Sequence, residues 1–302
     1  MLALPDLGEF SSNYPGTNEY MSWFTFAGTD IVLDREGLGI SGTLSGLFSV
    51  DPDGYSFLFG GSVSMFSFDA AALTQSTADD LALLRQWLSG DDTLTGSAFA
   101  DNMFGANGND TIYGNEGNDT LIGNDGDDQI SGGLGADTVA GGQGNDLLNG
   151  NEGQDSLVGS AGDDTLIGGA GNDTMQGGTG SDRLTGNIGT DYMYAGLDSV
   201  RDVFVFRGVD NSTVGATRDV IYEFVAGTDD INLTLIDANS TLVNDQGFSF
   251  SGTTAQANSV WYALTRSGTD LIVFADVDGD AIRDFSVQLV GVTSLSASDF
   301  LL

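Results

Sequence analysis

The feature that most constrains this chain is a nine-residue period that runs without a gap from Gly105 to Tyr194. The stretch contains ten units, and the first three read GANGNDTIY, GNEGNDTLI and GNDGDDQIS. Every unit has Gly at positions 1 and 4, Asp at position 6, and Ile, Leu, Val or Met at position 8. A flexible Gly/Asp-rich linker has no reason to keep four positions fixed, so the period predicts a repetitive folded structure.

The glycines and the single apolar residue of each unit predict a coiled, stacked fold. Glycine at positions 1 and 4, with Gly or Asn common at position 2, allows positive φ angles and therefore a tight loop. The last residues of the unit form a short strand in which only position 8 is buried. Because one unit cannot bury that side chain alone, we expect a right-handed parallel β-roll with two units per coil. The position-8 side chains would then lie between two parallel sheets.

Stacking also brings acidic side chains together. With two units per coil, the Asp at position 6 of one unit lies above the Asp two units further along the chain. Two carboxylates and the carbonyl groups of the loops offer only oxygen ligands, and Ca²⁺ takes six or more of these. Same-side neighbours run from Asp110/Asp128 to Asp173/Asp191, which predicts about eight ions.

The predicted ligands form a regular set. The carboxylates are those at position 6, namely Asp110, Asp119, Asp128, Asp137, Asp146, Asp155, Asp164, Asp173, Asp182 and Asp191. The glycines at positions 1 and 4 are predicted to shape the same loops: Gly105, Gly108, Gly114, Gly117, Gly123, Gly126, Gly132, Gly135, Gly141, Gly144, Gly150, Gly153, Gly159, Gly162, Gly168, Gly171, Gly177 and Gly180. Two degenerate units precede the regular ones and add Asp92 and Asp101.

These residues resemble the RTX nonapeptide repeat, GGxGxDxUx, over the whole of 105–194. The resemblance implies a calcium-binding β-roll in a secreted protein.

Composition excludes several classes of function. The chain has 302 residues, a formal net charge of −36, and neither His nor Cys. Such a charge repels nucleic acid and anionic membranes and attracts cations. Without His there is no HExxH zinc site and no Ser–His–Asp or Cys–His nucleophile. No apolar run is long enough to predict a membrane span, and the first residues lack the basic and apolar regions of a cleavable signal peptide.

Residues 1–86 are predicted to form an N-terminal β-rich cap module with short helices. Alternating aromatic residues indicate short strands, and residues 68–73 and 77–88 indicate two helices. The apolar stripe of the second helix would cover the open first coil of the roll. Tyr14, Tyr20 and Trp23 form either a sugar-stacking surface or, as is commoner in small β-modules, part of a core. This segment resembles the module that precedes RTX arrays in other secreted bacterial proteins.

Residues 207–302 are predicted to form a C-terminal β-sandwich-like domain or a continuation of the roll. Hydrophobic runs at 220–224, 229–233, 248–252, 260–264 and 270–292 indicate its strands. The segment resembles the C-terminal domain of the serralysin family in the Asp219–Val220–Ile221, GTDDINL and DVDGDAIRDF runs and in the terminus 299–302. That resemblance implies an uncleaved type I secretion signal read by an ABC-type exporter. The roll itself would occupy 87–206.

An acidic run near the C-terminus invites an EF-hand interpretation. Asp276, Asp278 and Asp280 have the right spacing, but Ala281 stands where the loop needs Gly, and Val287 stands where it needs Glu. The sequence therefore favours a tight acidic β-turn, with a further calcium site as the alternative.

Together these patterns predict an all-β, non-enzymatic, calcium-binding protein that is secreted and acts in a surface layer, matrix or adhesive contact. Its partners would be calcium, the exporter, and either further copies of itself or a cell-surface glycan. One alternative is an extracellular hydrolase that uses carboxylates on polysaccharide. Another is binding of sugar or ice by the roll surface, where Thr120, Thr138, Ser156 and Thr174 form an outward row. The strand preference of Thr explains that row without a ligand.

Overall fold

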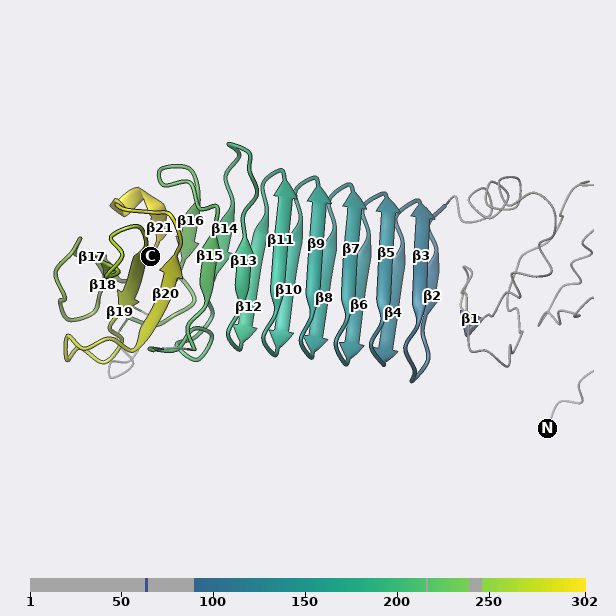
Figure 1. The fold of residues 1–302 in the computed structure, drawn as a ribbon, viewed down its shortest axis with the longest axis horizontal. Helices are drawn as coiled ribbons and strands as arrows, with labels where there is room; N and C mark the ends of the chain where they lie inside the picture. Colours follow the sequence, from purple (N-terminus) through teal and green to yellow (C-terminus); the bar gives the residue numbers. More distant parts are fainter. Residues whose placement is uncertain (1–62, 65–89, 216, 239–245) are drawn as a thin grey trace, which may run out of the picture.

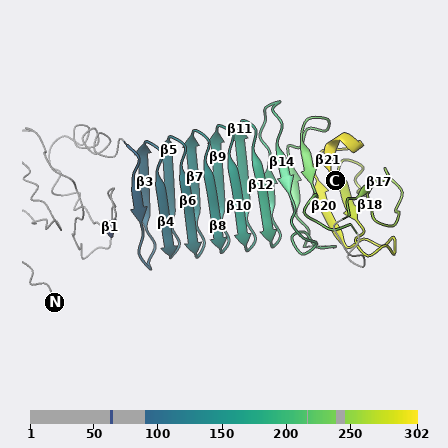
Figure 2. The same cartoon turned by 180° about the vertical axis from the view of Figure 1, so that it is seen from behind.

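The structure is a computed structural model that describes residues 63–64, 90–215, 217–238 and 246–302. Two sheets face each other along an elongated stack of strands (Figure 1), and Figure 2 shows the same strands from behind. The strands and helices predicted for 1–86, with the aromatic surface of Tyr14, Tyr20 and Trp23, lie outside the described residues, apart from the short strand β1 (Val63–Ser64).

Successive strands alternate between the two sheets, so each coil contains two units. The first sheet contains, in spatial order, β1, β2 (Thr93–Thr95), β4 (Thr111–Glu116), β6 (Gln129–Leu134), β8 (Leu147–Glu152), β10 (Thr165–Ala170), β12 (Arg183–Ile188), β14 (Val203–Val205), β16 (Asp230–Asn232) and β21 (Phe300–Leu301). The second contains β17 (Ser249–Phe250), β18 (Ser259–Leu264), β19 (Leu271–Ala275), β20 (Phe285–Leu289), β15 (Val220–Tyr222), β13 (Tyr192–Tyr194), β11 (Thr174–Thr179), β9 (Ser156–Ala161), β7 (Thr138–Gln143), β5 (Thr120–Asp125) and β3 (Asn102–Asn107). A single 3₁₀ turn, η1 (Ala297–Asp299), precedes β21.

The register of the repeats confirms the predicted core. Neighbouring strands are parallel, and Ile112 lies beside Ile130 as Leu121 lies beside Val139, two units apart in each case. Every position-8 side chain is at most 2% exposed. These residues form one row from each sheet: Leu94, Ile112, Ile130, Leu148, Leu166 and Leu184, facing Met103, Leu121, Val139, Leu157, Met175 and Met193. The expected all-β parallel roll is therefore confirmed.

The glycines of the repeat serve two different purposes. Position 4 has a positive φ throughout, and at Gly171 a Cβ would lie 1.4 Å from a carbonyl oxygen of the neighbouring coil. Position 2 also has a positive φ, even where it is Ala106 or Ser160. Position 1 has no positive φ in any repeat, so the prediction that its glycine serves such an angle is wrong. Glycine is needed there for space, as the metal centre shows.

The described chain after the repeats lengthens the same two sheets. In the first sheet Phe204 lies between Leu184 and Ile231, and in the second Ile221 continues the row of Met193. β20 pairs with β15 in parallel, and β19 and β18 then add antiparallel pairs. The predicted strands of 207–302 are present. A β-sandwich as a unit of its own is not confirmed, because these strands extend the roll.

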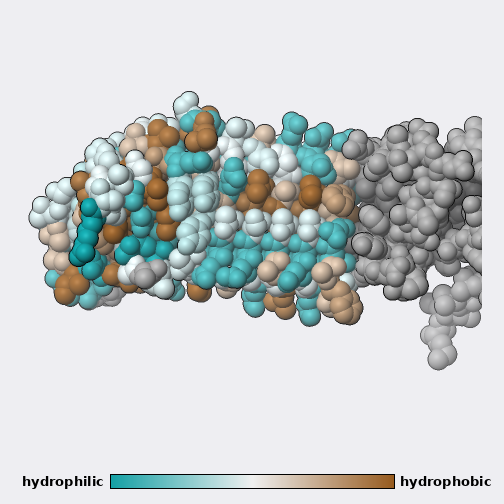
Figure 3. Space-filling model, viewed as in Figure 1, coloured by the Kyte–Doolittle hydropathy of each residue, from teal (hydrophilic) through white to brown (hydrophobic). Residues whose placement is uncertain are grey.

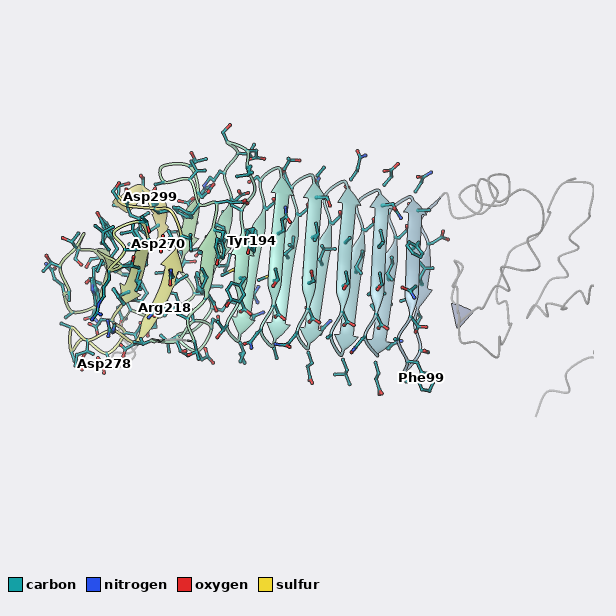
Figure 4. The ribbon with its side chains drawn as sticks, viewed as in Figure 1. Phe99, Tyr194, Arg218, Asp270, Asp278 and Asp299 are labelled. Atoms are coloured by element: carbon teal, nitrogen blue, oxygen red, sulfur yellow. The ribbon has the colours of Figure 1, made fainter. Side chains whose placement is uncertain are left out.

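The outer face of the second sheet has two rows of side chains that follow the length of the roll. The predicted hydroxyl row is formed, since its members are paired in neighbouring strands: Thr120, Thr138, Ser156 and Thr174. Beside it runs an apolar row, visible along the middle of this face in Figure 3: Phe104, Ile122, Ala140 and Val158. The tyrosines of β13 and β15 follow further along, with Tyr194 and Tyr222 stacked at 4.6 Å (Figure 4).

Candidate metal centre

Two rows of aspartates run along the roll, one before the strands of each sheet. The first ladder, before strands of the first sheet, contains Asp92, Asp110, Asp128, Asp146, Asp164 and Asp182. The second ladder contains Asp101, Asp119, Asp137, Asp155, Asp173 and Asp191. Within each ladder the backbone N–H of one aspartate donates to Oδ1 of the next at 2.7–2.9 Å. Aspartates two units apart are therefore stacked, as the period predicts.

The other oxygen of these carboxylates, Asp101 excepted, has no hydrogen-bond partner. Oδ2 is buried and without a hydrogen bond in every repeat, and each of these side chains is at most 3% exposed. The affected repeat residues are Asp110, Asp119, Asp128, Asp137, Asp146, Asp155, Asp164, Asp173, Asp182 and Asp191, and the half-buried Asp92 before them has the same unpartnered Oδ2. A buried charged group without a partner costs several kcal/mol. The ladders therefore require either protons or cations.

The position-1 glycine leaves room beside the Oδ2 of each repeat aspartate. A Cβ on Gly159 would lie 2.3 Å from Asp164 Oδ2 and 2.6 Å from the carbonyl oxygen of Gly177. A carboxylate of one coil and a carbonyl of the next thus converge on the same point. Gly105 has the same surroundings, with Asp110 Oδ2 at 2.1 Å. A set of oxygen ligands from two coils fits Ca²⁺, which accepts carboxylate and backbone carbonyl oxygens.

Burial and like charges disfavour the ionised form of the ladder carboxyls. Burial, together with the smaller effect of the neighbouring ladder carboxylates, raises the pKa of Asp128 and of Asp164 to about 7. Burial likewise raises the pKa of Asp110 to about 6, against the lowering effect of the Asp92 N–H. A divalent cation would remove this penalty, since an adjacent positive charge favours the carboxylate.

Three aspartates beyond the repeats join the ladders, and none of them is among the ligands predicted from the sequence. The N–H of Asp182 donates to Asp202 Oδ1 at 2.8 Å, and the N–H of Asp202 donates to Asp229 Oδ1 at 3.0 Å. In the second ladder the N–H of Asp191 donates to Asp219 Oδ1 at 2.9 Å. The intervals are 20, 27 and 28 residues in place of 18, so the period does not find them. The remaining signal is an apolar residue two places after each Asp.

Protein donors close the ladders at two of their ends. Asp101 Oδ2 accepts the backbone N–H of Ser97 at 2.6 Å and its hydroxyl at 2.9 Å. Asp229 Oδ2 accepts the N–H of Val225 at 2.7 Å. Of the predicted ligands, Asp101 therefore differs from the rest, since protein groups already satisfy the oxygen that its neighbours leave without a partner.

The acidic run after β19 forms a turn, as the sequence favours. Carboxylates of Asp276, Asp278 and Asp284, without Asp280, approach within 4.8 Å of one another. Asp276 is buried, and its oxygens accept the N–H groups of Gly279 at 3.1 Å and Asn258 at 2.7 Å. Asp278 is exposed in the loop at the far end of the molecule (Figure 4). Its surroundings are those of a hydrogen-bonded turn.

Comparison with known families agrees with the geometry of the repeats. Six overlapping segments match the family described as "RTX calcium-binding nonapeptide repeat (4 copies)": 88–121, 104–139, 113–148, 141–175, 149–184 and 167–199. Residues 88–199 are RTX repeats. This stretch is called the RTX roll below. The match ends before the C-terminal strands, so their resemblance to the serralysin family is not confirmed.

Three solved structures are similar to this chain. The AlgE6R2 subunit of the Azotobacter vinelandii mannuronan C5-epimerase is 21% identical, over 70% of this chain and 92% of that one, with a TM-score of 0.33. The AlgE6R3 subunit of the same enzyme is 19% identical, over 70% and 78%, with a TM-score of 0.23. The extracellular lipase LipA from Serratia marcescens is 19% identical, over 70% and 38%, with a TM-score of 0.22. No curated protein matches the chain. Within the described residues, no helix has the length and apolar character that crossing a membrane requires.

Proposed function

We propose that this is a secreted, non-enzymatic calcium-binding protein whose RTX roll folds around Ca²⁺ outside the cell. It then serves as a structural part of a surface layer, matrix or adhesive contact. The observation that supports this best is the double row of buried carboxylate oxygens without a hydrogen-bond partner. Residues 105–194 contain fifteen acidic side chains and one Arg, a net charge of −14. About eight Ca²⁺, one for each same-side pair, would bring +16 and cancel it.

The apolar core of the roll is too small to offset this repulsion without help. Each unit buries one position-8 side chain, which is worth roughly 1.5–3 kcal/mol. Ordering the backbone costs about 1–2 kcal/mol for each residue, so one unit costs more than its apolar residue returns. The free energy of calcium binding then becomes free energy of folding. Extracellular calcium modules bind at about 10⁻⁴–10⁻³ M, so the chain would stay unfolded in the cytosol and fold outside.

A titration of the full chain with Ca²⁺, followed by far-ultraviolet circular dichroism, tests calcium-driven folding. We expect the β-spectrum to develop at submillimolar to millimolar Ca²⁺ and to be weak in excess chelator. Mg²⁺ is the matched control, because its strict octahedral geometry and tightly held water suit an all-protein cage poorly. A full β-spectrum in chelator that Ca²⁺ leaves unchanged would refute the proposal.

Export through an ABC-type system is the second part of the proposal. The C-terminal residues Phe300–Leu301 lie in β21 beside β16, and Asp299 is buried next to them. We expect deletion of 299–302 to leave the chain inside cells that carry the exporter. Because deletion also removes a strand, residues 207–302 fused to an unrelated passenger give an independent reading. Secretion of the deleted chain, or retention of the fused passenger, would contradict this route.

A second candidate function, glycan binding by the roll surface, is favoured by a groove on the outer face of the first sheet. The groove has a volume of about 610 Å³ and is lined by Tyr113 and by the amides of Asn115, Asn149, Asn151 and Asn187. Amides and an exposed aromatic ring suit a neutral sugar, since the net charge of −36 opposes an acidic one. Binding of neutral glycans that Tyr113→Ala abolishes and Thr138→Ala leaves intact would favour this function. Turnover of glycans or esters in the same assay would favour the hydrolase alternative.

A further inference from the structure

Asp219 continues the second ladder although it lies outside the RTX roll. It precedes β15 as Asp191 precedes β13, and it makes the same contacts. The Asp191 N–H donates to Asp219 Oδ1 at 2.9 Å, as the Asp173 N–H donates to Asp191 Oδ1 at 2.9 Å. The Val220 N–H donates to the Asp191 carbonyl at 2.8 Å, as the Tyr192 N–H donates to the Asp173 carbonyl at 2.8 Å. The backbone contacts of a repeat are therefore reproduced without its sequence.

The second oxygen of Asp219 is buried and has no hydrogen bond. Asp219 and Asp191 are both 0% exposed, and Oδ2 of each is without a partner. The nearby hydroxyl of Ser212 accepts the Asp219 N–H at 2.8 Å and donates to the Ser286 carbonyl at 2.6 Å. That hydroxyl hydrogen is therefore engaged elsewhere. Two buried carboxylates thus face the junction with unpartnered oxygens.

The first ladder does not extend in the same way. Ala195 stands where the next unit would have its position-1 glycine, because its carbonyl oxygen lies 2.7 Å from a Cβ on Gly177. Ala195 is 0% exposed, so its methyl occupies room that glycine leaves open in the repeats. At the end of that ladder, both oxygens of Asp229 accept backbone N–H groups. Past the repeats, within the described residues, Asp219 is the ladder residue whose carboxylate has a fully buried oxygen without a hydrogen-bond partner.

We propose that Asp191 and Asp219 hold a further divalent cation, best suited to Ca²⁺, at the junction between the RTX roll and the C-terminal strands. This inference rests on the proposed function and adds a site that the repeat sequence does not encode. Because β15 pairs with both β13 and β20, the ion would fasten the C-terminal strands to the last repeat. The ion would also balance the carboxylate of Asp219, which would otherwise need a proton.

Crystals of the wild-type chain grown in Ca²⁺ test the site through anomalous diffraction. We expect a peak about 2.3–2.6 Å from Asp219 Oδ2, the usual distance of a calcium ligand. Peaks between the repeat aspartates with none at Asp219 would overturn this inference and leave the proposed function intact. Absence of peaks at the repeats and at Asp219 would overturn both.

Native mass spectrometry of variants provides a second reading. Asp219→Asn keeps the acceptor for the Asp191 N–H but removes the charge, and we expect it to bind one ion fewer than the wild type. Asp229→Asn is the matched control, since protein donors satisfy both of its oxygens, and we expect an unchanged number of ions. An equal number in Asp219→Asn and the wild type would mean that Asp219 is a buried protonated acid, which overturns the site. If Asp219→Asn does not fold in Ca²⁺, the diffraction experiment on the wild type decides.

Discussion

The RTX roll and the strands that follow it share the same two sheets but neutralise their aspartates differently. In the roll one oxygen of every ladder carboxylate except that of Asp101 has no protein partner. In the C-terminal strands Asp299 accepts the N–H groups of Gly227 and Ser296, each at 2.5 Å, and Asp230 pairs with Arg201. One continuous pair of sheets therefore has a part that depends on a cation from solution and a part in which buried carboxylates such as Asp299 and Asp230 have protein partners.

The apolar core of the C-terminal strands is also better able than that of the roll to hold its region together without a cation. The roll buries one aliphatic or Met side chain in each unit. The C-terminal strands pack aromatic rings together, with Phe206 and Phe285 at 5.0 Å and Phe250 and Phe300 at 5.2 Å. Aromatic side chains bury more area than aliphatic ones and add favourable ring contacts. We therefore expect the C-terminal strands to retain more structure than the roll when calcium is removed.

Acidification should have the largest effect on this difference, because it acts on every ladder carboxyl at once. Burial raises the pKa of Asp128 and Asp164 from 3.8 to about 7 and that of Asp173 to about 6. A carboxyl whose pKa is higher in the folded than in the unfolded chain stabilises the folded state when it is protonated. This stabilisation is fully present below the pKa of the unfolded chain and is lost as the pH rises through the pKa of the folded chain. In calcium-free buffer the roll should therefore be more stable at pH 4.5 than at pH 7.5. In Ca²⁺ the order should reverse, because protons compete for the ligands.

Thermal unfolding followed by circular dichroism at the two pH values measures this. A melting temperature in calcium-free buffer that is the same or lower at pH 4.5 would contradict the account of the ladder carboxyls.

Loss of two adjacent ligands should have the next largest effect. The double variant Asp146→Asn with Asp164→Asn removes charge from three same-side pairs in the middle of the roll, and it should raise the Ca²⁺ concentration at the folding midpoint several-fold. Asp278→Asn is the matched control, because that carboxylate is exposed outside the ladders. Calcium titrations of both variants make the comparison. Equal midpoints for the two would show that the ladder charges do not bind the ion.

A truncation in each core separates the regions further. Leu157 in β9 and Leu289 in β20 are both 0% exposed, so each change to Ala should cost about 2–5 kcal/mol. Leu157→Ala should be compensated by more Ca²⁺, since calcium binding and folding of the roll are coupled. Added Ca²⁺ should restore less of the stability that Leu289→Ala loses. Unfolding in urea at several Ca²⁺ concentrations measures this. An equal gain in stability with Ca²⁺ for the two variants would contradict the difference between the roll and the C-terminal strands.

The smallest expected effect is that of a methyl group at position 1. Gly159→Ala meets no positive φ, so its cost comes from the crowding of Asp164 Oδ2 and the Gly177 carbonyl. We expect weaker binding at that one site and a modest shift of the calcium midpoint. Gly171→Ala at position 4 should destabilise the roll at any Ca²⁺ concentration, because its methyl would meet backbone at a positive φ. Isothermal titration calorimetry distinguishes the two, and a calcium-independent loss in Gly159→Ala would contradict the proposed purpose of position 1.

The repeat sequence predicts most of the roll because one local pattern determines both neighbours and burial. The stacked aspartates, and the buried row that includes Ile112 and Leu121, follow from the period alone. The period could not predict Asp219, because a longer loop separates it from Asp191 while the sheet register is kept. The reason for Gly at position 1 was also missed, since the need for space beside Oδ2 depends on the neighbouring coil. The signal that survives outside the repeats is an Asp two residues before a buried apolar side chain.

Hydrogen–deuterium exchange of the full chain, with and without Ca²⁺ at pH 7.5, tests the central claim most directly. The account predicts that amides of the repeats, such as those of β7 and β9, are protected only in Ca²⁺. Amides of β18, β19 and β20 should keep part of their protection without it. Repeats that remain protected in calcium-free buffer would contradict the claim that a cation completes the roll.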